Sequence, residues 1–193
     1  YTMDDKDVYG NLIYQMSFKV AIEAGIISDY EIRTIAVSSA EVKRLWDENA
    51  FVRPIESELD DLTARSLAAH LAVKRVIDTQ GVRKIISFHR SLRAAKDFRD
   101  RSNQIFNLYP ENDGIECFYV SGDQRMDLRT RTIDSFAEAD VGMITNARCL
   151  NEGVDIPSVD CILFADPRRS TIDIVQAVGR VLRKPPGKEK GTI

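Results

Sequence analysis

Four short apolar runs, interspersed with helix-like stretches, constrain the fold of this chain more than any other feature. Each run mixes β-branched and aromatic residues, which is typical of a strand buried on both faces. The runs span Lys84–Phe88, Ile115–Val120, Val141–Thr145 and Val159–Phe164. The helix-like stretches span residues 91–106, 125–138 and 170–183. This alternation predicts right-handed βαβ crossovers and therefore an α/β fold, in which helices sandwich a parallel sheet.

The part of the chain before residue 82 predicts helices and one strand. Residues 62–80 form a helical pattern with leucines on one side. Further upstream we expect a helix at Gln15–Ala24, a strand at Tyr30–Val37, a helix at Ala40–Asn49 and a loop around Pro54. We therefore divide the chain into a connector, residues 1–61, and an α/β domain, residues 62–193. Because residues 191–193 look like the start of a strand, we expect an excised piece of a longer protein.

Composition places the chain among ordinary globular proteins. Its 193 residues are enough for one packed domain and an appendage, and 44% of them are hydrophobic against 30% charged. No apolar run approaches the roughly 18 residues that a membrane span needs, and the N-terminus lacks a signal-peptide pattern. The 3 cysteines are scattered without metal-ligand spacing, which favours a reducing compartment. We therefore expect a cytoplasmic protein without a membrane partner.

The net charge of −3 hides an uneven distribution. Residues 1–62 hold 6 basic and 13 acidic side chains, whereas the rest of the chain holds 21 basic and 17 acidic ones. The second part contains two basic clusters: Arg83, Lys84, Arg90, Arg93, Lys96, Arg99 and Arg101, and then Arg168, Arg169, Arg180, Arg183, Lys184, Lys188 and Lys190. Such clusters could line a groove that binds phosphates. The alternative, above all for the first cluster, is a set of solvated helix faces.

Residues 170–184, STIDIVQAVGRVLRK, carry the most chemical information. Ser170–Asp173 is a capping-box-like start, so a helix is expected to begin here. At about 100° per residue, Gln176, Arg180 and Arg183 share one side of this helix. The opposite side is apolar and holds Ile174, Val175, Val178, Val181 and Leu182. Two neighbouring arginines repel each other, so phosphate oxygens are natural partners, although a surface helix with solvated arginines is the alternative.

The same segment resembles a known helicase motif. Gln176–Arg183, QAVGRVLR, is similar to motif VI of superfamily 2 helicases, Q-x-x-G-R-x-x-R. The resemblance implies the C-terminal, second RecA-like domain of such a motor, with Gln176, Arg180 and Arg183 as catalytic residues that act on ATP across an interdomain cleft. In this family the arginines stabilise charge on the γ-phosphate and the glutamine helps to order the site. Phosphoryl transfer depends on such electrostatic positioning.

Thr145–Pro157, TNARCLNEGVDIP, resembles motif V of the same superfamily, in the form found in restriction-enzyme motors. The resemblance implies nucleic-acid contacts by Thr145, Asn146 and Arg148. It also implies nucleotide contacts by Glu152, Gly153 and Asp155, where the glycine allows a close backbone approach. The alternative is an ordinary loop, because Asn, Gly and Asp are common turn formers. The likeness to restriction-enzyme motors favours DNA over RNA as the partner.

Two weaker matches complete the set. Residues 84–91, KIISFHRS, resemble motif IV, and residues 119–122, YVSG, resemble a turn that the family has after the next strand. Together they imply nucleic-acid contacts by Ser87, His89, Arg90, Ser91, Ser121 and Gly122. A plain histidine and a simple turn are the alternatives. The resemblance as a whole covers residues 82–193.

Neither a phosphate-binding G-x-x-x-x-G-K-[ST] loop nor a D-E-x-[DH] string occurs in the sequence. We therefore expect ATP with Mg²⁺ to be held mainly by a first motor domain, the N-terminal RecA-like domain of the same polypeptide, and this chain alone to hydrolyse no ATP. The sequence thus predicts part of an ATP-dependent helicase or translocase. Alternatives are a non-catalytic nucleic-acid-binding module and the motor part of a restriction endonuclease subunit. The missing glycine-rich loop argues against a small-molecule enzyme.

Overall fold

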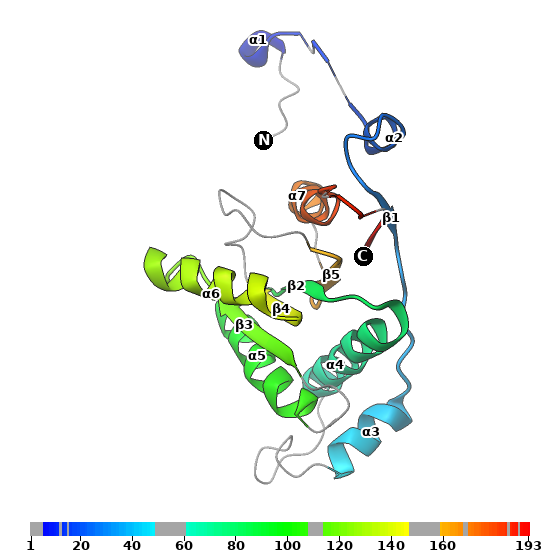
Figure 1. Cartoon of the computed structure of the whole chain (residues 1–193), viewed down its shortest axis with the longest axis vertical. Helices are drawn as coiled ribbons and strands as arrows, with labels where there is room; N and C mark the ends of the chain where they lie inside the picture. Colours follow the sequence, from blue (N-terminus) through cyan, green and yellow to red (C-terminus); the bar gives the residue numbers. More distant parts are fainter. Residues whose placement is uncertain are drawn as a thin grey trace.

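The computed structural model describes residues 6–11, 13–14, 16–48, 61–107, 114–146, 159–167, 170–184, 186–188 and 190–193. Within these ranges, a parallel sheet of six strands has the order β1-β6-β5-β2-β4-β3 (Figure 1). The strands are β1 (Asp29–Glu31), β2 (Lys84–Phe88), β3 (Ile115–Val120), β4 (Val141–Asn146), β5 (Cys161–Phe164) and β6 (Lys190–Thr192). The four predicted apolar runs therefore form four adjacent strands.

Helices cover both faces of this sheet. In the described ranges they are α1 (Lys6–Tyr9), α2 (Phe18–Glu23), α3 (Ser39–Glu48), α4 (Asp61–Gln80), α5 (Leu92–Phe106), α6 (Met126–Glu138) and α7 (Thr171–Val181). Helices α3, α4 and α5 share a core with one face, whereas α6 and α7 share a core with the other (Figure 1). The predicted α/β fold, a parallel sheet between helices, is confirmed.

The central strands β2 and β4 show why runs of apolar residues predicted the strands of this sheet. Ile85 of β2 pairs in register with Met143 of β4, and both belong to the core under α4 and α5. The next pair, Ile86 and Ile144, belongs to the core under α6 and α7. All four side chains are at most 1% exposed. Because successive strand residues point to opposite faces, a strand covered on both sides needs apolar residues at consecutive positions.

The segment before α4 differs from the sequence prediction in extent. The strand predicted at residues 30–37 is regular only in β1, because β1 lies at the edge of the sheet and its neighbour β6 is itself three residues long. Helix α2 begins at Phe18, where the Ser17 hydroxyl accepts a hydrogen bond from the backbone and caps the helix. Both β1 and α3, from the predicted connector, pack with the rest of the fold. The domain boundary after residue 61 stays a prediction.

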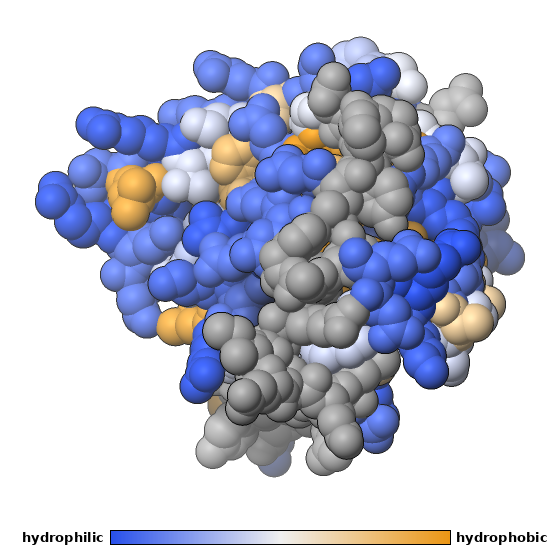
Figure 2. All heavy atoms as spheres, turned by 90° about the horizontal axis from the view of Figure 1, so that it is seen from below, coloured by the Kyte–Doolittle hydropathy of each residue, from blue (hydrophilic) through white to orange (hydrophobic). Residues whose placement is uncertain are grey.

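The surface is mostly polar on the face seen from below in Figure 2, where hydrophobic side chains form only small, separate areas. Scattered apolar groups of this kind are normal on a folded protein and do not mark a binding site by themselves. Among the helices that the structure describes, none is both long and apolar enough to cross a bilayer.

Candidate functional site

Helix α7 carries the predicted catalytic side chains. Its start is fixed by Ser170, whose hydroxyl accepts a hydrogen bond from a backbone N–H three residues further on, at 3.2 Å. Its inward side packs in the core with α6, through Ala177, Val178, Val181 and Leu182, each at most 6% exposed. Burial of this side holds the helix against the sheet, so the other side of α7 faces outward.

The outward side of α7 carries the predicted polar set. Gln176 is exposed and Arg180 is half-buried, as the helical spacing predicts. Val175 was predicted on the apolar side but is 44% exposed. It lies about 100° around the helix from Gln176, so it falls on the flank rather than against the sheet. The exposed side of the helix is therefore wider than the spacing of the three site residues suggests, and part of it is apolar.

Gly179 lies on the same outward side and has no packing reason to be glycine among the described residues. It is exposed, and a Cβ built on it would meet no atom within 4 Å. A glycine inside a helix costs about 1 kcal/mol relative to alanine, because it loses more conformational freedom on folding. Its bare backbone leaves room for a close approach to α7 between Gln176 and Arg180.

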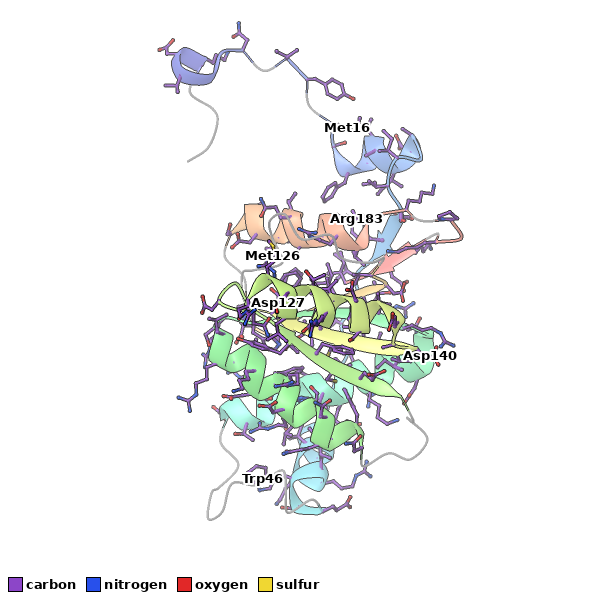
Figure 3. All side chains as sticks on the ribbon, turned by 60° about the vertical axis from the view of Figure 1, so that its left-hand side comes forward. Met16, Trp46, Met126, Asp127, Asp140 and Arg183 are labelled. Atoms are coloured by element: carbon purple, nitrogen blue, oxygen red, sulfur yellow. The ribbon has the colours of Figure 1, made fainter. Side chains whose placement is uncertain are left out.

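Arg183 lies beyond the regular part of α7, which ends at Val181 with Leu182 as its C-cap. Its side chain is exposed, and Figure 3 shows it at the end of the helix beside β1. Three carbonyls at this end accept hydrogen bonds from outside the helix. Lys188 Nζ donates to Val181, while Ser28 donates to Leu182 through its backbone N–H (2.9 Å) and to Arg183 through its hydroxyl (3.3 Å). No local sequence pattern marks Ser28, so its contact with α7 was not predicted.

At the carboxyl end of β2, the predicted site residues Ser87 and His89 are buried. Ser87 is 0% exposed and His89 is 2% exposed. The Ser87 hydroxyl and His89 Nε2 are hydrogen-bonded at 2.7 Å, and the His89 ring lies 4.7 Å from the Phe98 ring of α5. These two side chains therefore form a polar layer between the sheet and α5 and do not reach the surface.

The carboxyl end of β4 is equally enclosed. Thr145 and Asn146 are both 0% exposed. The Thr145 hydroxyl donates to the carbonyl of Ala95 in α5 at 2.9 Å. Asn146 Nδ2 makes a long contact of 3.5 Å with the Ser87 carbonyl, and Asn146 Oδ1 has no hydrogen-bond partner within the described part of the chain. The two residues tie β4 to α5 and to β2, beneath the edge of the sheet.

Other predicted nucleic-acid contacts lie at the surface of that edge. Arg90 and Ser91 are exposed at the start of α5, and Gly122 is exposed after β3. The Arg90 backbone donates to the Asp166 carboxylate at 2.9 Å, and the Ser91 hydroxyl caps α5. The N-terminus of a helix carries partial positive charge, so an anion is favoured there. Ser121, beside Gly122, is 4% exposed.

Four predicted site residues lie outside the described residues: Arg148, Glu152, Gly153 and Asp155. Their assignment to the nucleic acid or to the nucleotide stays a prediction.

Comparison with protein families agrees with this geometry. Residues 68–185 match the helicase conserved C-terminal domain, a span that begins in α4 and includes all of α7. The chain therefore belongs to the helicase C-terminal domain family. The predicted C-terminal domain of a helicase is confirmed by this match. The similarity to a restriction enzyme agrees with the predicted likeness to restriction-enzyme motors.

Known proteins similar to this chain are helicases and a restriction enzyme. An African swine fever virus protein (isolate Tick/Malawi/Lil 20-1/1983), named "Probable helicase A859L", is 24% identical over 195 residues, covering 100% of this chain and 20% of that protein. The ATP-dependent Type ISP restriction-modification enzyme LlaBIII bound to DNA is 26% identical with a TM-score of 0.77, covering 99% of this chain and 13% of that one. Domain 2 of the DEAD-box helicase Mss116p bound to an RNA duplex shares the fold, with 16% identity and a TM-score of 0.52. The match covers 68% of this chain and 48% of that one. The chain thus spans about a fifth of the viral protein.

Proposed function

We propose that this chain is the second motor domain of an ATP-dependent nucleic-acid helicase or translocase. The observation that carries the proposal is the outward side of α7. There Gln176 and Arg180 face away from the core, with exposed Arg183 just beyond the helix, all within the span that matches the helicase family. Guanidinium groups on one side of a helix fit a phosphate, because their forked N–H groups match its oxygens.

In the proposed reaction, a first motor domain presents ATP to α7. Arg180 and Arg183 stabilise the negative charge that develops as the γ-phosphoryl group is transferred to water, and Gln176 orders the site. Glu152, Gly153 and Asp155 complete the nucleotide contacts from this side. Mg²⁺ and most contacts with ATP belong to the first domain, since this sequence holds no phosphate-binding loop. This chain alone is then inactive.

The proposed nucleic-acid path runs over the carboxyl edge of the sheet. Arg90, Ser91 and Gly122 offer a guanidinium, a hydroxyl and a backbone N–H at the surface of that edge. Arg148 is proposed beside them. The buried Ser87, His89, Ser121, Thr145 and Asn146 then act indirectly, by fixing the strand ends that bear these groups.

DNA is the proposed partner, and a restriction-enzyme motor is the favoured parent. The supporting observation is the similarity to LlaBIII, which carries the higher TM-score and identity of the two solved structures compared above and is described as bound to DNA. Cycles of closure between the two motor domains would then move the protein along the strand.

ATP hydrolysis by the full-length protein tests the proposal. We would measure it without nucleic acid and with single-stranded DNA, duplex DNA and RNA, for the native protein and for Arg180→Ala. Arginines that stabilise phosphoryl transfer typically contribute about 10³-fold or more to turnover, so a loss of this size is expected, with the largest stimulation by DNA.

Arg65→Ala serves as the matched control, because Arg65 is an exposed arginine of α4, on the other face of the sheet from α7. It should leave turnover unchanged. Turnover that survives in Arg180→Ala would overturn the catalytic assignment and leave a non-catalytic nucleic-acid-binding module. Stimulation by RNA alone would overturn the choice of DNA.

A further inference from the structure

Ser28 lies far along the chain from the catalytic helix and yet holds its end. It precedes β1 directly and is 1% exposed. Its backbone N–H donates to the carbonyl of Leu182 at 2.9 Å, and its hydroxyl donates to the carbonyl of Arg183 at 3.3 Å, across 155 residues of sequence. One connector residue therefore satisfies two carbonyls at the C-terminal end of α7, which the helix itself leaves without partners.

These hydrogen bonds matter most for Arg183. Up to Val181 the helical backbone fixes where each side chain points, but Arg183 follows the C-cap, where that regular geometry has ended. The hydrogen bond from the Ser28 hydroxyl is one contact that holds the Arg183 carbonyl in place. The direction of this arginine therefore depends on the connector as well as on α7.

Ser28 itself is held on both sides. The next residue, Asp29, pairs with Lys190 where β1 joins the sheet. On the other side, Phe18 of α2 and Ile27 pack against the core that contains Val178 and Leu182 of α7. Figure 1 shows α2, the start of β1 and α7 close together. Ser28 is therefore a fixed point between the sheet and the catalytic helix.

We propose that Ser28 is a positioning residue that orients Arg183 for phosphoryl transfer. The inference rests on the proposed function, because it requires Arg183 to act on ATP. Ser28 does not touch the nucleotide. It holds the peptide that carries Arg183, so the segment before α3 contributes to the geometry of ATP hydrolysis. A small displacement of a catalytic group lowers the rate of the chemical step steeply, while the binding of substrate depends on it less.

Ser28→Ala in the full-length protein tests this role, since it removes the hydroxyl and keeps the backbone N–H. We expect kcat for DNA-stimulated ATP hydrolysis to fall by about tenfold, with little change in KM for ATP. Ser102→Ala is the matched control. Ser102 is 0% exposed, and its hydroxyl donates to the Phe98 carbonyl within α5 at 2.7 Å, so the control removes a bond of the same kind away from α7. Ser102→Ala should lower the free energy of unfolding about as much as Ser28→Ala does, and it should leave kcat unchanged.

A second comparison separates positioning from general stability. Arg183→Lys replaces the planar guanidinium with an ammonium, so exact orientation matters less. Adding Ser28→Ala to Arg183→Lys should lower kcat by less than about twofold, because two residues that act through one group are not additive. Equal losses in both backgrounds, or equal effects of Ser28→Ala and Ser102→Ala, would overturn the positioning role. If Arg183→Lys and Arg180→Ala both leave kcat intact, the proposed function fails instead.

Discussion

His70 of α4 stacks on Phe98 of α5, with the ring centroids 3.9 Å apart and the ring planes 20° from parallel. The His70 ring is fully buried, and its Nδ1 donates to the Ser66 carbonyl at 2.6 Å. Burial lowers the pKa of the imidazole to about 4, although the nearby carbonyls of Ser66 and Phe98 act in the opposite direction. A neutral histidine therefore joins the two helices that cover this face of the sheet.

The free energy of unfolding should fall as the pH drops from about 6.5 to about 4. In the unfolded chain His70 takes up a proton near its ordinary pKa of about 6.5, whereas in the folded chain it does so near a pKa of about 4. In this window the unfolded state holds more protons and is favoured by acid. The full effect, reached below pH 4, is about 3 kcal/mol. Urea unfolding of the chain across this range measures it.

His70→Gln supplies the control for this pH dependence. Glutamine keeps a hydrogen-bond donor for the Ser66 carbonyl and has no charge to gain. Its unfolding free energy should change less between about pH 6.5 and 5, where most carboxylates are still ionised. Parallel curves for the two proteins would contradict the assignment to His70.

Lys84→Met should lower the free energy of unfolding by about 1–3 kcal/mol. The Lys84 ammonium donates to the carbonyls of Phe136 (2.7 Å), Ala137 (3.0 Å) and Ala139 at the end of α6. Methionine keeps the apolar stem and leaves these carbonyls without a donor. Lys19→Met is the comparison, because Lys19 is 84% exposed in a loose pair with Glu23, and such pairs contribute about 0–1 kcal/mol. Chemical denaturation measures both variants. Equal losses of unfolding free energy in Lys84→Met and Lys19→Met would show that the Lys84 ammonium does not stabilise the fold.

Gly179→Ala should stabilise the fold and impair the enzyme. Alanine fits without a clash and should raise the free energy of unfolding by about 1 kcal/mol. If the first motor domain approaches the bare backbone at Gly179, the new methyl group should lower ATP turnover of the full-length protein. Gly142→Ala should instead lower the free energy of unfolding, because its Cβ would lie 2.9 Å from the Phe136 ring. Unchanged turnover in Gly179→Ala would argue against a close approach there.

Arg90→Ala should weaken DNA binding by the full-length protein in a salt-dependent manner. Losing one phosphate contact should reduce the slope of log affinity against log salt concentration by about one. Fluorescence anisotropy with labelled single-stranded DNA at several salt concentrations would measure this. Arg131→Ala, an exposed arginine of α6, is the matched comparison. An unchanged slope for Arg90→Ala would place the DNA elsewhere.

The central sheet was predictable from sequence because its strands are buried on both faces. Consecutive apolar residues such as Ile85 and Ile86 then carry the signal within one short run. The same alternation could have identified Ser87 as buried. It stands two residues after Ile85, on the face that α5 covers, as Thr145 does two residues after Met143. The motif resemblance predicted nucleic-acid contacts for both residues, whereas the alternation along each strand places them on the buried face under α5.

Contacts between distant parts of the chain could not be predicted. The outward side of α7 follows from helical spacing, so the outward positions of Gln176 and Arg180 were predictable. Ser28 acts through one hydroxyl and one backbone N–H, on carbonyls 154 and 155 residues away. Any serine could make such bonds, and only the meeting of β1, β6 and α7 selects this one.

The pairing of β1 with β6 has a consequence for biosynthesis. Glu31 and Thr192 face each other in adjacent strands although 161 residues separate them. At a synthesis rate of about 5–20 residues per second, β1 leaves the ribosome on the order of ten seconds before its partner strand exists. The segment that contains β1 must therefore wait for β6, and it can pair in the sheet only after β2, β3, β4 and β5 have been synthesised.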